Sequence, residues 1–398
     1  MDSTWHRHQI ETLTHLDGRD QRRTLRVYDK TTGSHVQWQG RRLVNMSSND
    51  TLGLSQHPAL IKALQEATAR YGCGAGASRL VCGTSTLHQD LESHLALFKG
   101  TEAALSLGAG FQTNVSVLAA LIRQVDTQHP PLAFVDRLVH ASLYDGLKMA
   151  GLRPIRFRHN DMAHLADLLT RHAAHRGPRF ILTESVFSMD GDRADLPTLV
   201  TLAEKHHALL YVDEAHATGL LGPQGRGLCA NPDVKGRIGL VMGTFSKALG
   251  GYGSFVATTP LLKEWLVQHC RGLIYSTALP PPVIAAAQAA LNVVPTLDDA
   301  RQQIERSAHT VRHALKKLGY NTGTSDTHII PVLIGSDHET VTLAHHLEDA
   351  GILAVAIRPP TVPPKTGRIR LAISALHTPE HLDQVCDAFH TFSRYGAS

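Results

Sequence analysis

The sequence lacks the cysteine pairs and long apolar runs that mark secreted and membrane proteins. Its 398 residues include only five cysteines, and none of them forms a CxxC pair, which is typical of free thiols in a reducing compartment. The first 19 residues contain no apolar signal-peptide core. The closest approach to a membrane span, 283–294, is short and interrupted by Gln288 and Asn292. We therefore expect a cytoplasmic protein without a membrane partner.

A strong net charge and the common metal and nucleotide motifs are also lacking. The formal net charge of +4 is too small to favour nucleic acid, although it is compatible with a phosphate-bearing ligand. The 26 histidines form no HExxH pattern, so we predict no metal site. Residues 213–216, Asp-Glu-Ala-His, match the box of a helicase family. However, no lysine lies in a GxxxxGK[ST] loop, which argues against a nucleotide-driven motor.

Between about residues 100 and 260, short apolar segments alternate with helical patterns. Such alternation predicts an α/β fold with a mostly parallel seven-stranded sheet and helices on both faces. Ligands of such sheets bind at the carboxyl ends of the strands. The expected strands are 104–108, 132–135, 155–158, 180–184, 209–213, 238–243 and 254–257.

The proline run 280–282 is followed by a smaller α+β pattern. Apolar residues between 304 and 318 recur on one helical face, and Thr378-Pro379 would begin the last helix. Further elements are expected at 329–334 (strand), 340–350 (helix), 352–357 (strand) and 368–374 (strand). The predicted domains are an N-terminal arm, 1–50, a large α/β domain, 51–290, and a small C-terminal α+β domain, 291–398.

Two of the expected strand ends carry groups that could bind a ligand. Gly108, Gly110 and Phe111 follow the first strand, where backbone N–H groups at a helix start can bind phosphate, although a plain turn fits equally well. A dinucleotide fingerprint would need glycine where Thr113 stands. Asp213 ends another strand, and a buried carboxylate there needs a cationic partner unless it caps a loop.

Other expected strand ends carry Glu184, Ser188, His140 and the segment GTFSKALGGYG, which contains Lys247. Each residue alone would more often be structural. Together these positions supply a phosphate binder, a ring stacker, a carboxylate, a hydroxyl and a lysine, which is the set that pyridoxal phosphate requires. Small apolar neighbours and a nearby cationic ring would lower the pKa of Lys247 and make it nucleophilic.

These segments resemble the α-oxoamine synthases, a branch of the fold-type-I pyridoxal-phosphate enzymes, over nearly the whole chain. The segments that carry the resemblance are SSNDTLGLSQHP, GAGASRLVCGTSTLHQDLE, VHASLYDG, TESVFSMDGD, VDEAHATGLLGPQGRG, GTFSKALGGYG, IYSTALPP and AIRPPTVPPKTGRIRLAIS. The family usually has tyrosine where Thr51 stands, which leaves fine specificity open. Members of this fold type build their sites at a dimer interface, so the resemblance implies a homodimer.

The resemblance implies a pyridoxal 5'-phosphate cofactor and an acyltransferase activity. The runs YSTALPP and IRPPTVP favour decarboxylative condensation of L-alanine with pimeloyl-CoA or pimeloyl-acyl carrier protein, giving 8-amino-7-oxononanoate, CO2 and free thiol in biotin biosynthesis. A synthase that uses glycine or serine with another acyl-CoA stays an alternative. A non-enzymatic regulator that retains the fold is a third interpretation.

The resemblance also assigns roles to individual residues. Lys247 would form a Schiff base with the cofactor and remove the substrate α-proton, while Asp213, His216 and His140 would hold the ring nitrogen, hold the phenolic oxygen and stack on the ring. The further cofactor-binding residues would be Gly110, Phe111, Ser188, Thr244 and, toward a partner subunit, Ser276 and Thr277. The substrate-binding residues would be Arg26, Asn49, His140, Glu184, Arg358 and Thr361.

Two of these arginines have distinct expected roles. Arg358 would bind the amino acid carboxylate as a planar fork. Arg26, together with Thr361, would line the side of the acyl thioester. A surface ion pair is the alternative interpretation for both arginines.

Overall fold

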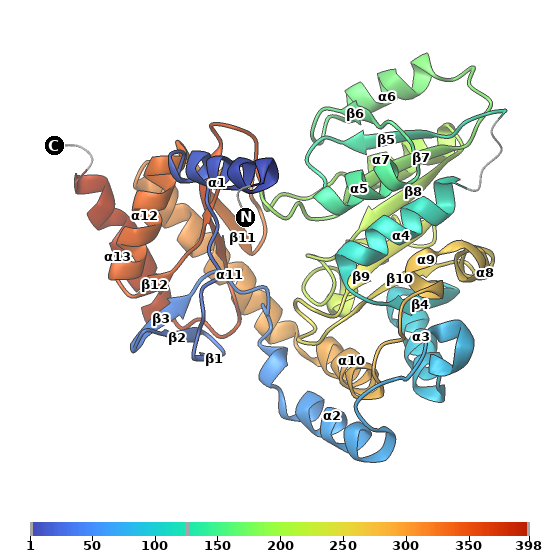
Figure 1. Cartoon of the computed structure of the whole chain (residues 1–398), viewed down its shortest axis with the longest axis horizontal. Coiled ribbons are helices and arrows are strands. Elements are labelled where there is room, and N and C mark those ends of the chain that lie inside the picture. Colours follow the sequence, from blue (N-terminus) through green and yellow to red (C-terminus); the bar gives the residue numbers. More distant parts are fainter. Residues whose placement is uncertain (1–2, 124–127, 396–398) are drawn as a thin grey trace. The chain divides into compact units, whose positions relative to one another are not determined.

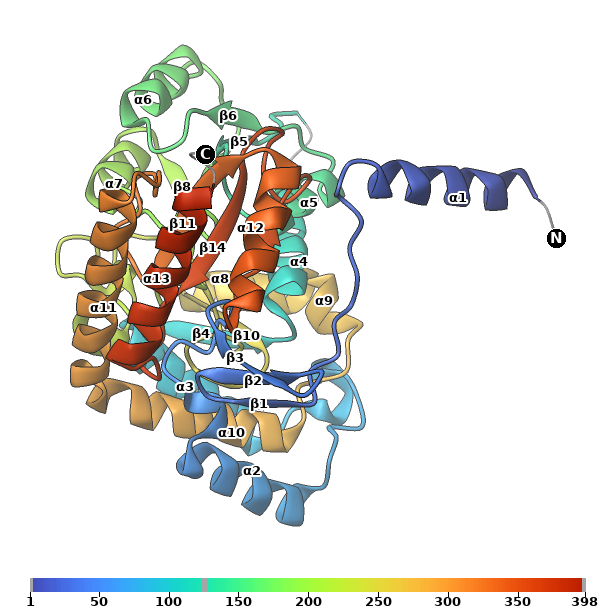
Figure 2. The same cartoon turned by 90° about the vertical axis from the view of Figure 1, so that its left-hand side faces the viewer.

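The computed structural model describes residues 3–123 and 128–395. Its contacts divide the chain into two compact units (Figures 1 and 2). We call the unit formed by Leu52–Ser188 and Arg193–Arg301 the sheet unit, and the unit formed by Met1–Thr51, Met189–Asp192 and Gln302–Ser398 the terminal unit. The predicted domains 1–50, 51–290 and 291–398 stay a prediction, because units of dense contact need not be folding domains.

The sheet unit contains a seven-stranded sheet in the order β4-β10-β9-β8-β7-β5-β6, which confirms the predicted fold class. Strand β10 runs antiparallel to both of its neighbours, and the other neighbouring pairs are parallel. Every strand predicted between about residues 100 and 260 is present, and its ends agree with the structure to within two residues. The strands are β4 (Ala103–Leu107), β5 (Leu132–Asp136), β6 (Ile155–Phe157), β7 (Arg179–Glu184), β8 (Ala208–Asp213), β9 (Leu240–Thr244) and β10 (Ser254–Thr258).

Helices cover both faces of this sheet. On one face, alternate strand residues such as Phe180 and Leu182 share a core with Val117 of α4, because successive side chains of a strand point to opposite faces. Helix α7 packs against β8 and buries Leu199 outside that core, so it lies on the opposite face (Figure 2). The longer helices of the unit are α2 (Pro58–Tyr71), α3 (Thr86–Lys99), α4 (Gly110–Arg123), α5 (Ala141–Met149), α6 (Met162–Arg171), α7 (Leu196–Lys205), α8 (Pro260–His269) and α10 (Pro281–Val293).

Short helical turns connect the longer elements of the sheet unit. Several follow glycines with positive φ, such as Gly53 and Gly222, whose missing Cβ permits the turn. The short elements are η1 (Leu54–Gln56), the π-helical η2 (Arg79–Gly83), η3 (Pro223–Gly225), η4 (Leu228–Ala230), α9 (Arg271–Ile274) and η5 (Val294–Thr296).

The terminal unit contains two small sheets. One has the order β1-β2-β3-β12, with β12 parallel to β3, and the other has the antiparallel order β11-β14-β13. The strands are β1 (Lys30–Thr32), β2 (His35–Trp38), β3 (Arg41–Asn45), β11 (Ile329–Gly335), β12 (Ile352–Leu353), β13 (Ala356–Ile357) and β14 (Gly367–Ala372). The helices are α1 (Thr4–Asp17), α12 (Asp337–Asp349), α13 (Pro379–Tyr395) and α11 (Asp298–Lys317), which begins in the sheet unit.

The expectations for this part of the chain are met unevenly. The predicted strand 352–357 is wrong as a single element, because it divides into β12 and β13, which join different sheets. The helix predicted at 340–350 begins earlier, at Asp337, where the Ser336 hydroxyl accepts a hydrogen bond from Glu339 N–H. Strands β1 to β3 lie within what the sequence suggested only as an arm.

Candidate active site

The carboxyl ends of the sheet strands, with the loops and helix starts that follow them, surround a cavity of about 160 Å³. The structure brings nine of the predicted site residues together there. They are Gly110, Phe111, His140, Glu184, Ser188, Asp213, His216, Thr244 and Lys247. The structure therefore places these residues together at the strand ends, while the assignment of the site and the role of each residue stay a prediction.

Lys247 lies three residues beyond the end of β9 and is directed toward His216. The distance between Lys247 Nζ and His216 Nε2 is 2.7 Å. Gly250 allows this loop to close, since its φ is +68° and a Cβ there would lie 2.3 Å from Ser55 N. The glycine-rich segment thus holds an amine and an imidazole together at one side of the cavity.

Two buried carboxyl groups lie on adjacent strands. Asp213 and Glu184 are paired in the register of β8 and β7, and both side chains are buried. Glu184 accepts hydrogen bonds from the backbone N–H groups of His140 and Ser188. Burial, reinforced by the charge of Asp213, raises the pKa of Glu184 to about 8. Asp213 accepts hydrogen bonds from Asn114 Nδ2 at 2.7 Å and from Ala215 N–H at 2.9 Å.

His140 is the N-cap of α5, and its ring borders the cavity. Its Nδ1 lies 2.7 Å from Ser142 Oγ and 3.3 Å from Ser142 N. Phe111 meets the ring edge-on, with 6.3 Å between the ring centroids. Partial burial is the main cause that lowers the pKa of His140, although the charge of Asp213 opposes it.

The start of α4 and the end of β9 form the side of the cavity suited to an anion. A Cβ on Gly110 would approach Met242 Cε to 3.0 Å, so a larger residue would require the flexible Met242 side chain to move. The Thr244 hydroxyl donates to Gly253 O and lies 2.7 Å from Ser246 Oγ. A helix start and neighbouring hydroxyls are a combination that binds phosphate.

Sequence reasoning missed four residues of the lining. They are Asn114, Ala215, Met242 and Ser246. Asn114 carried a usable signal, because it is an amide near the start of α4, and such a side chain needs hydrogen-bond partners wherever it becomes buried. Ser246 precedes Lys247 directly, and its hydroxyl was a second signal.

Ser276 and Thr277 do not line this cavity. The Ser276 hydroxyl accepts a hydrogen bond from Gln112 Nε2 at 2.7 Å. Thr277 forms an isolated antiparallel bridge with Ser78. Their expected contact with a partner subunit stays a prediction.

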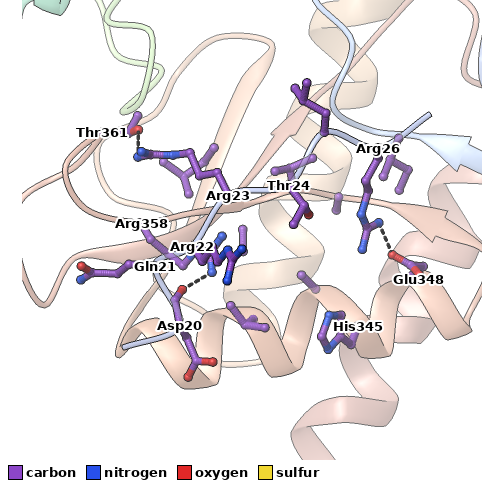
Figure 3. A pocket seen from close by; sticks show the side chains of 18 of the residues that line it. Asp20, Gln21, Arg22, Arg23, Thr24, Arg26, His345, Glu348, Arg358 and Thr361 are labelled. Atoms are coloured by element: carbon purple, nitrogen blue, oxygen red, sulfur yellow. Dashed lines mark hydrogen bonds and ion pairs between the residues drawn. The ribbon is translucent and has the colours of Figure 1, made fainter. Parts of the chain in front are cut away.

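The other predicted residues lie in the terminal unit. Arg26, Arg358 and Thr361 line a pocket of about 580 Å³ between the segment 17–28 and the elements around α12 (Figure 3). Arg26 pairs with Glu348, and Arg358 donates to the backbone oxygen of Asp20. Partial burial is the main cause that lowers the pKa of Arg358.

Asn49 does not line the pocket of the terminal unit. Its Oδ1 accepts a hydrogen bond from the buried Arg370 at 3.4 Å. Thr51 is buried in the following turn, where its hydroxyl donates to the backbone oxygen of Asn49 at 3.1 Å. Arg23, which was not predicted, lies 3.4 Å from the Thr361 hydroxyl.

The acid that follows Asp213 is engaged in the protein interior. Glu214 pairs with Lys99 Nζ at 2.5 Å, and both side chains are at most 1% exposed. Glu214 also accepts a hydrogen bond from Cys229 N–H at 2.9 Å. This ion pair anchors the turn that follows Asp213 and carries His216, and Glu214 does not line the cavity.

Comparison with known proteins identifies the family. The model of aminotransferase class I and II matches residues 41–389. The chain belongs to this family. A member from Gluconacetobacter diazotrophicus, an 8-amino-7-oxononanoate synthase, is 51% identical over 96% of each chain.

Solved structures agree with this assignment to the aminotransferase class I and II family. A serine palmitoyltransferase from S. paucimobilis with a bound PLP–myriocin aldimine gives a TM-score of 0.90, with 29% identity and 98% of each chain covered. An 8-amino-7-oxononanoate synthase from Francisella tularensis gives a TM-score of 0.76 with 25% identity, and the match covers 89% of this chain and 99% of that chain. These findings confirm the predicted α-oxoamine synthase family and its fold.

The described residues contain neither a metal cluster nor a membrane span. Across 3–123 and 128–395, no group of three or more His, Cys, Asp or Glu side chains could hold a metal ion. In the same part of the chain, each helix is too short or too polar to cross a membrane.

Proposed function

We propose that this chain is a pyridoxal-phosphate-dependent acyltransferase. It condenses L-alanine with a pimeloyl thioester, releases CO2 and free thiol, and so makes 8-amino-7-oxononanoate for biotin synthesis. The observation that carries the proposal is the convergence of Lys247, Asp213, His216 and His140 on one cavity. The 51% identity to a synthase of that product supports the choice of substrate.

The residues of the cavity fit the cofactor. A protonated pyridine nitrogen needs an anion, and Asp213 offers a buried carboxylate whose oxygens are held by Asn114 and Ala215. Gly110 at the start of α4 lines the cavity, where the backbone N–H groups of a helix start would hold the phosphate group. Bound pyridoxal phosphate would supply an electron sink that stabilises a carbanion at the α-carbon of the amino acid.

The side chains around the cavity divide the remaining work. Lys247 removes the α-proton of alanine when its Nζ is neutral, and His216, 2.7 Å away, holds that amine in place. His140 covers the cavity from α5, which orients the reacting atoms and restricts access by water. Glu184 fixes His140 and Ser188 through their backbone N–H groups.

Residues of the terminal unit select the substrates in this proposal. Arg358 binds the alanine carboxylate, because a guanidinium presents parallel donors to two oxygens. Arg26 and Thr361 line the side of the acyl thioester, and Asn49 holds the amino acid. The chain forms a homodimer in which Ser276 and Thr277 reach the partner's cofactor.

A matrix of substrates tests the proposal. Purified protein loaded with pyridoxal phosphate is given L-alanine, glycine or L-serine, each with pimeloyl-CoA, pimeloyl-acyl carrier protein or palmitoyl-CoA. Product is measured by mass spectrometry and CO2 by isotope release, because the exposed Cys73 and Cys82 would react with thiol reagents. We expect the nine-carbon amino ketone from L-alanine with a pimeloyl donor.

A lysine variant ties the activity to the cavity. Lys247→Ala should lower the rate by at least about a thousandfold, whereas Lys205→Ala at the exposed end of α7 should leave it unchanged. Product formation from L-serine and palmitoyl-CoA instead would favour a function like that of the serine palmitoyltransferases. No turnover with any pair of substrates would contradict an acyltransferase function.

A further inference from the structure

One buried amide connects three separate parts of the cavity wall. Asn114 lies one turn into α4 and is 1% exposed. Its Nδ2 contacts Asp213 Oδ2 at 2.7 Å and Ser142 Oγ at 2.9 Å, and its Oδ1 contacts the Tyr211 hydroxyl at 2.6 Å. Ser142 Oγ then contacts His140 Nδ1 at 2.7 Å. The two groups that face the cavity, Asp213 and His140, are thus joined through Asn114.

The direction of every hydrogen bond in this network follows from the donors available. An ionised carboxylate only accepts, so the NH2 group of Asn114 must face Asp213. The amide oxygen of Asn114 then accepts from the Tyr211 hydroxyl, which stays protonated because burial raises its pKa far above the usual value. Ser142 Oγ accepts the second Asn114 N–H. Because His140 Nδ1 already accepts from the Ser142 backbone N–H, the Ser142 hydroxyl is left to donate its own proton to Nδ1.

This order determines the proton position on His140. Its Nδ1 faces two donors, the Ser142 hydroxyl and the Ser142 backbone N–H. A nitrogen that accepts cannot also carry a proton, so the neutral ring carries its proton on Nε2. A second proton, on Nδ1, would point at the two Ser142 donors and could not form a hydrogen bond with either of them, so the neutral ring is favoured.

We propose that Asn114 is a positioning residue that holds Asp213 as an accepting carboxylate and, through Ser142, holds His140 as the neutral Nε2–H tautomer. This role rests on the proposed function, which identifies the group bound by Asp213 as the cofactor ring. Its physical result is a cavity wall in which Asp213 offers a negative charge while the neighbouring imidazole stays neutral. A cationic ring is therefore attracted to Asp213 without repulsion from His140.

Nitrogen NMR of cofactor-free protein tests the tautomer independently of any activity. Two-bond ¹H–¹⁵N spectra of ¹⁵N-histidine protein distinguish Nδ1–H from Nε2–H, and the loss of signals in His140→Phe assigns the ring. We expect the Nε2–H form in the unmodified protein. Asn114→Leu, which is similar in shape, and Ser142→Ala should each raise the ratio of Nδ1–H to Nε2–H by about fivefold, whereas Ser116→Ala on the same helix should not.

Cofactor affinity separates the two branches of the network. Equilibrium dialysis with pyridoxal phosphate should show about tenfold weaker binding for Asn114→Leu, because Asp213 loses one of its two hydrogen-bond donors. For Ser142→Ala, which leaves the contact between Asn114 and Asp213 intact, the change should be less than about twofold. An Nδ1–H ring in the unmodified protein, or an unchanged tautomer ratio in both variants, would overturn the positioning role. Neither result depends on the substrate, so they are distinguishable from a failure of the proposed reaction.

Discussion

The cavity of the sheet unit and the pocket of the terminal unit hold their polar groups in different ways. In the sheet unit, Asp213, Glu184 and Asn114 are at most 5% exposed, and each is fixed by short contacts from backbone or neighbouring side chains. In the pocket of the terminal unit, long arginine side chains such as Arg26 form partly exposed ion pairs (Figure 3). Buried, prearranged dipoles suit the stabilisation of charge that develops during a reaction, whereas flexible cations suit the recognition of a charged substrate.

The largest expected effect comes from neutralising the buried carboxylate of the cavity. Asp213→Asn should lower kcat/KM by at least about a thousandfold, or about 4 kcal/mol, because an amide cannot balance a cationic ring. The partly exposed Asp161 provides a control, since it caps α6 through His164 N–H and asparagine caps a helix equally well. Steady-state kinetics would check both variants. If kcat/KM of Asp213→Asn stayed within tenfold of the unmodified protein, the buried carboxylate would not be needed to stabilise charge in the reaction, and the contrast with the pocket of the terminal unit would fail.

The next effect concerns the ion pair that supports the Asp213 loop. Lys99→Met leaves Glu214 buried without its cation, so the free energy of unfolding should fall by about 3 kcal/mol. Lys62→Met breaks the exposed pair with Glu66, whose side chains are 77% and 68% exposed, and should change it by less than about 0.5 kcal/mol. Urea denaturation compares the two. Equal losses would show that the buried pair contributes no more than a surface pair.

The same contrast explains how much the sequence could predict. All seven strands of the central sheet were predicted because each is a short, mostly apolar segment, and several of them end at a polar or glycine residue. Most of the cavity followed, since parallel strands bring their carboxyl ends to one edge. Asn114 was missed because it lies one turn into α4 and not at a strand end, whereas Ser246, two residues beyond β9, was overlooked beside Lys247.

The terminal unit was predicted less completely for a physical reason. Strands β1 to β3 are short, and β12 pairs with β3 across more than three hundred residues of chain, so no local pattern indicates their sheet. The partners of Arg26 and Arg358, which are Glu348 and the Asp20 backbone, are equally remote in sequence. Long-range pairing of this kind cannot be inferred from periodicity.

A buried histidine makes the stability of the terminal unit depend on pH. His377 accepts from Ser374 N–H and donates to Asn45 O, and burial lowers its pKa to about 4 from 6.5. The unfolded chain therefore binds more protons between these values. The contribution of His377 is fully present above pH 6.5 and is lost as the pH falls toward 4, with a loss of about 2 kcal/mol at pH 5.

Urea titrations from pH 8 to 5 would measure this loss. His377→Gln should reduce by about one the number of protons taken up on unfolding, and so flatten the change of the unfolding free energy with pH, because glutamine does not titrate. His313→Gln on the exposed side of α11 should leave this pH dependence unchanged. If the free energy of unfolding of His377→Gln depended on pH as strongly as that of the unmodified protein, the effect would belong to other histidines. His88 of the sheet unit is one such group, since burial lowers its pKa to about 4 as well.

The smallest expected effect tests the pocket of the terminal unit. Arg26 pairs with Glu348 and lies 4.7 Å above the Trp38 ring, yet its side chain is 34% exposed. Arg26→Ala should therefore cost less than about 1 kcal/mol of stability. Because the proposed role is substrate recognition, KM for the pimeloyl donor should rise by about fivefold while kcat stays unchanged. Arg171→Ala, which breaks the exposed pair with Asp167 outside this pocket, is the control and should leave KM unchanged. A fall in kcat for Arg26→Ala would show that this arginine acts in the reaction step and not only in substrate binding.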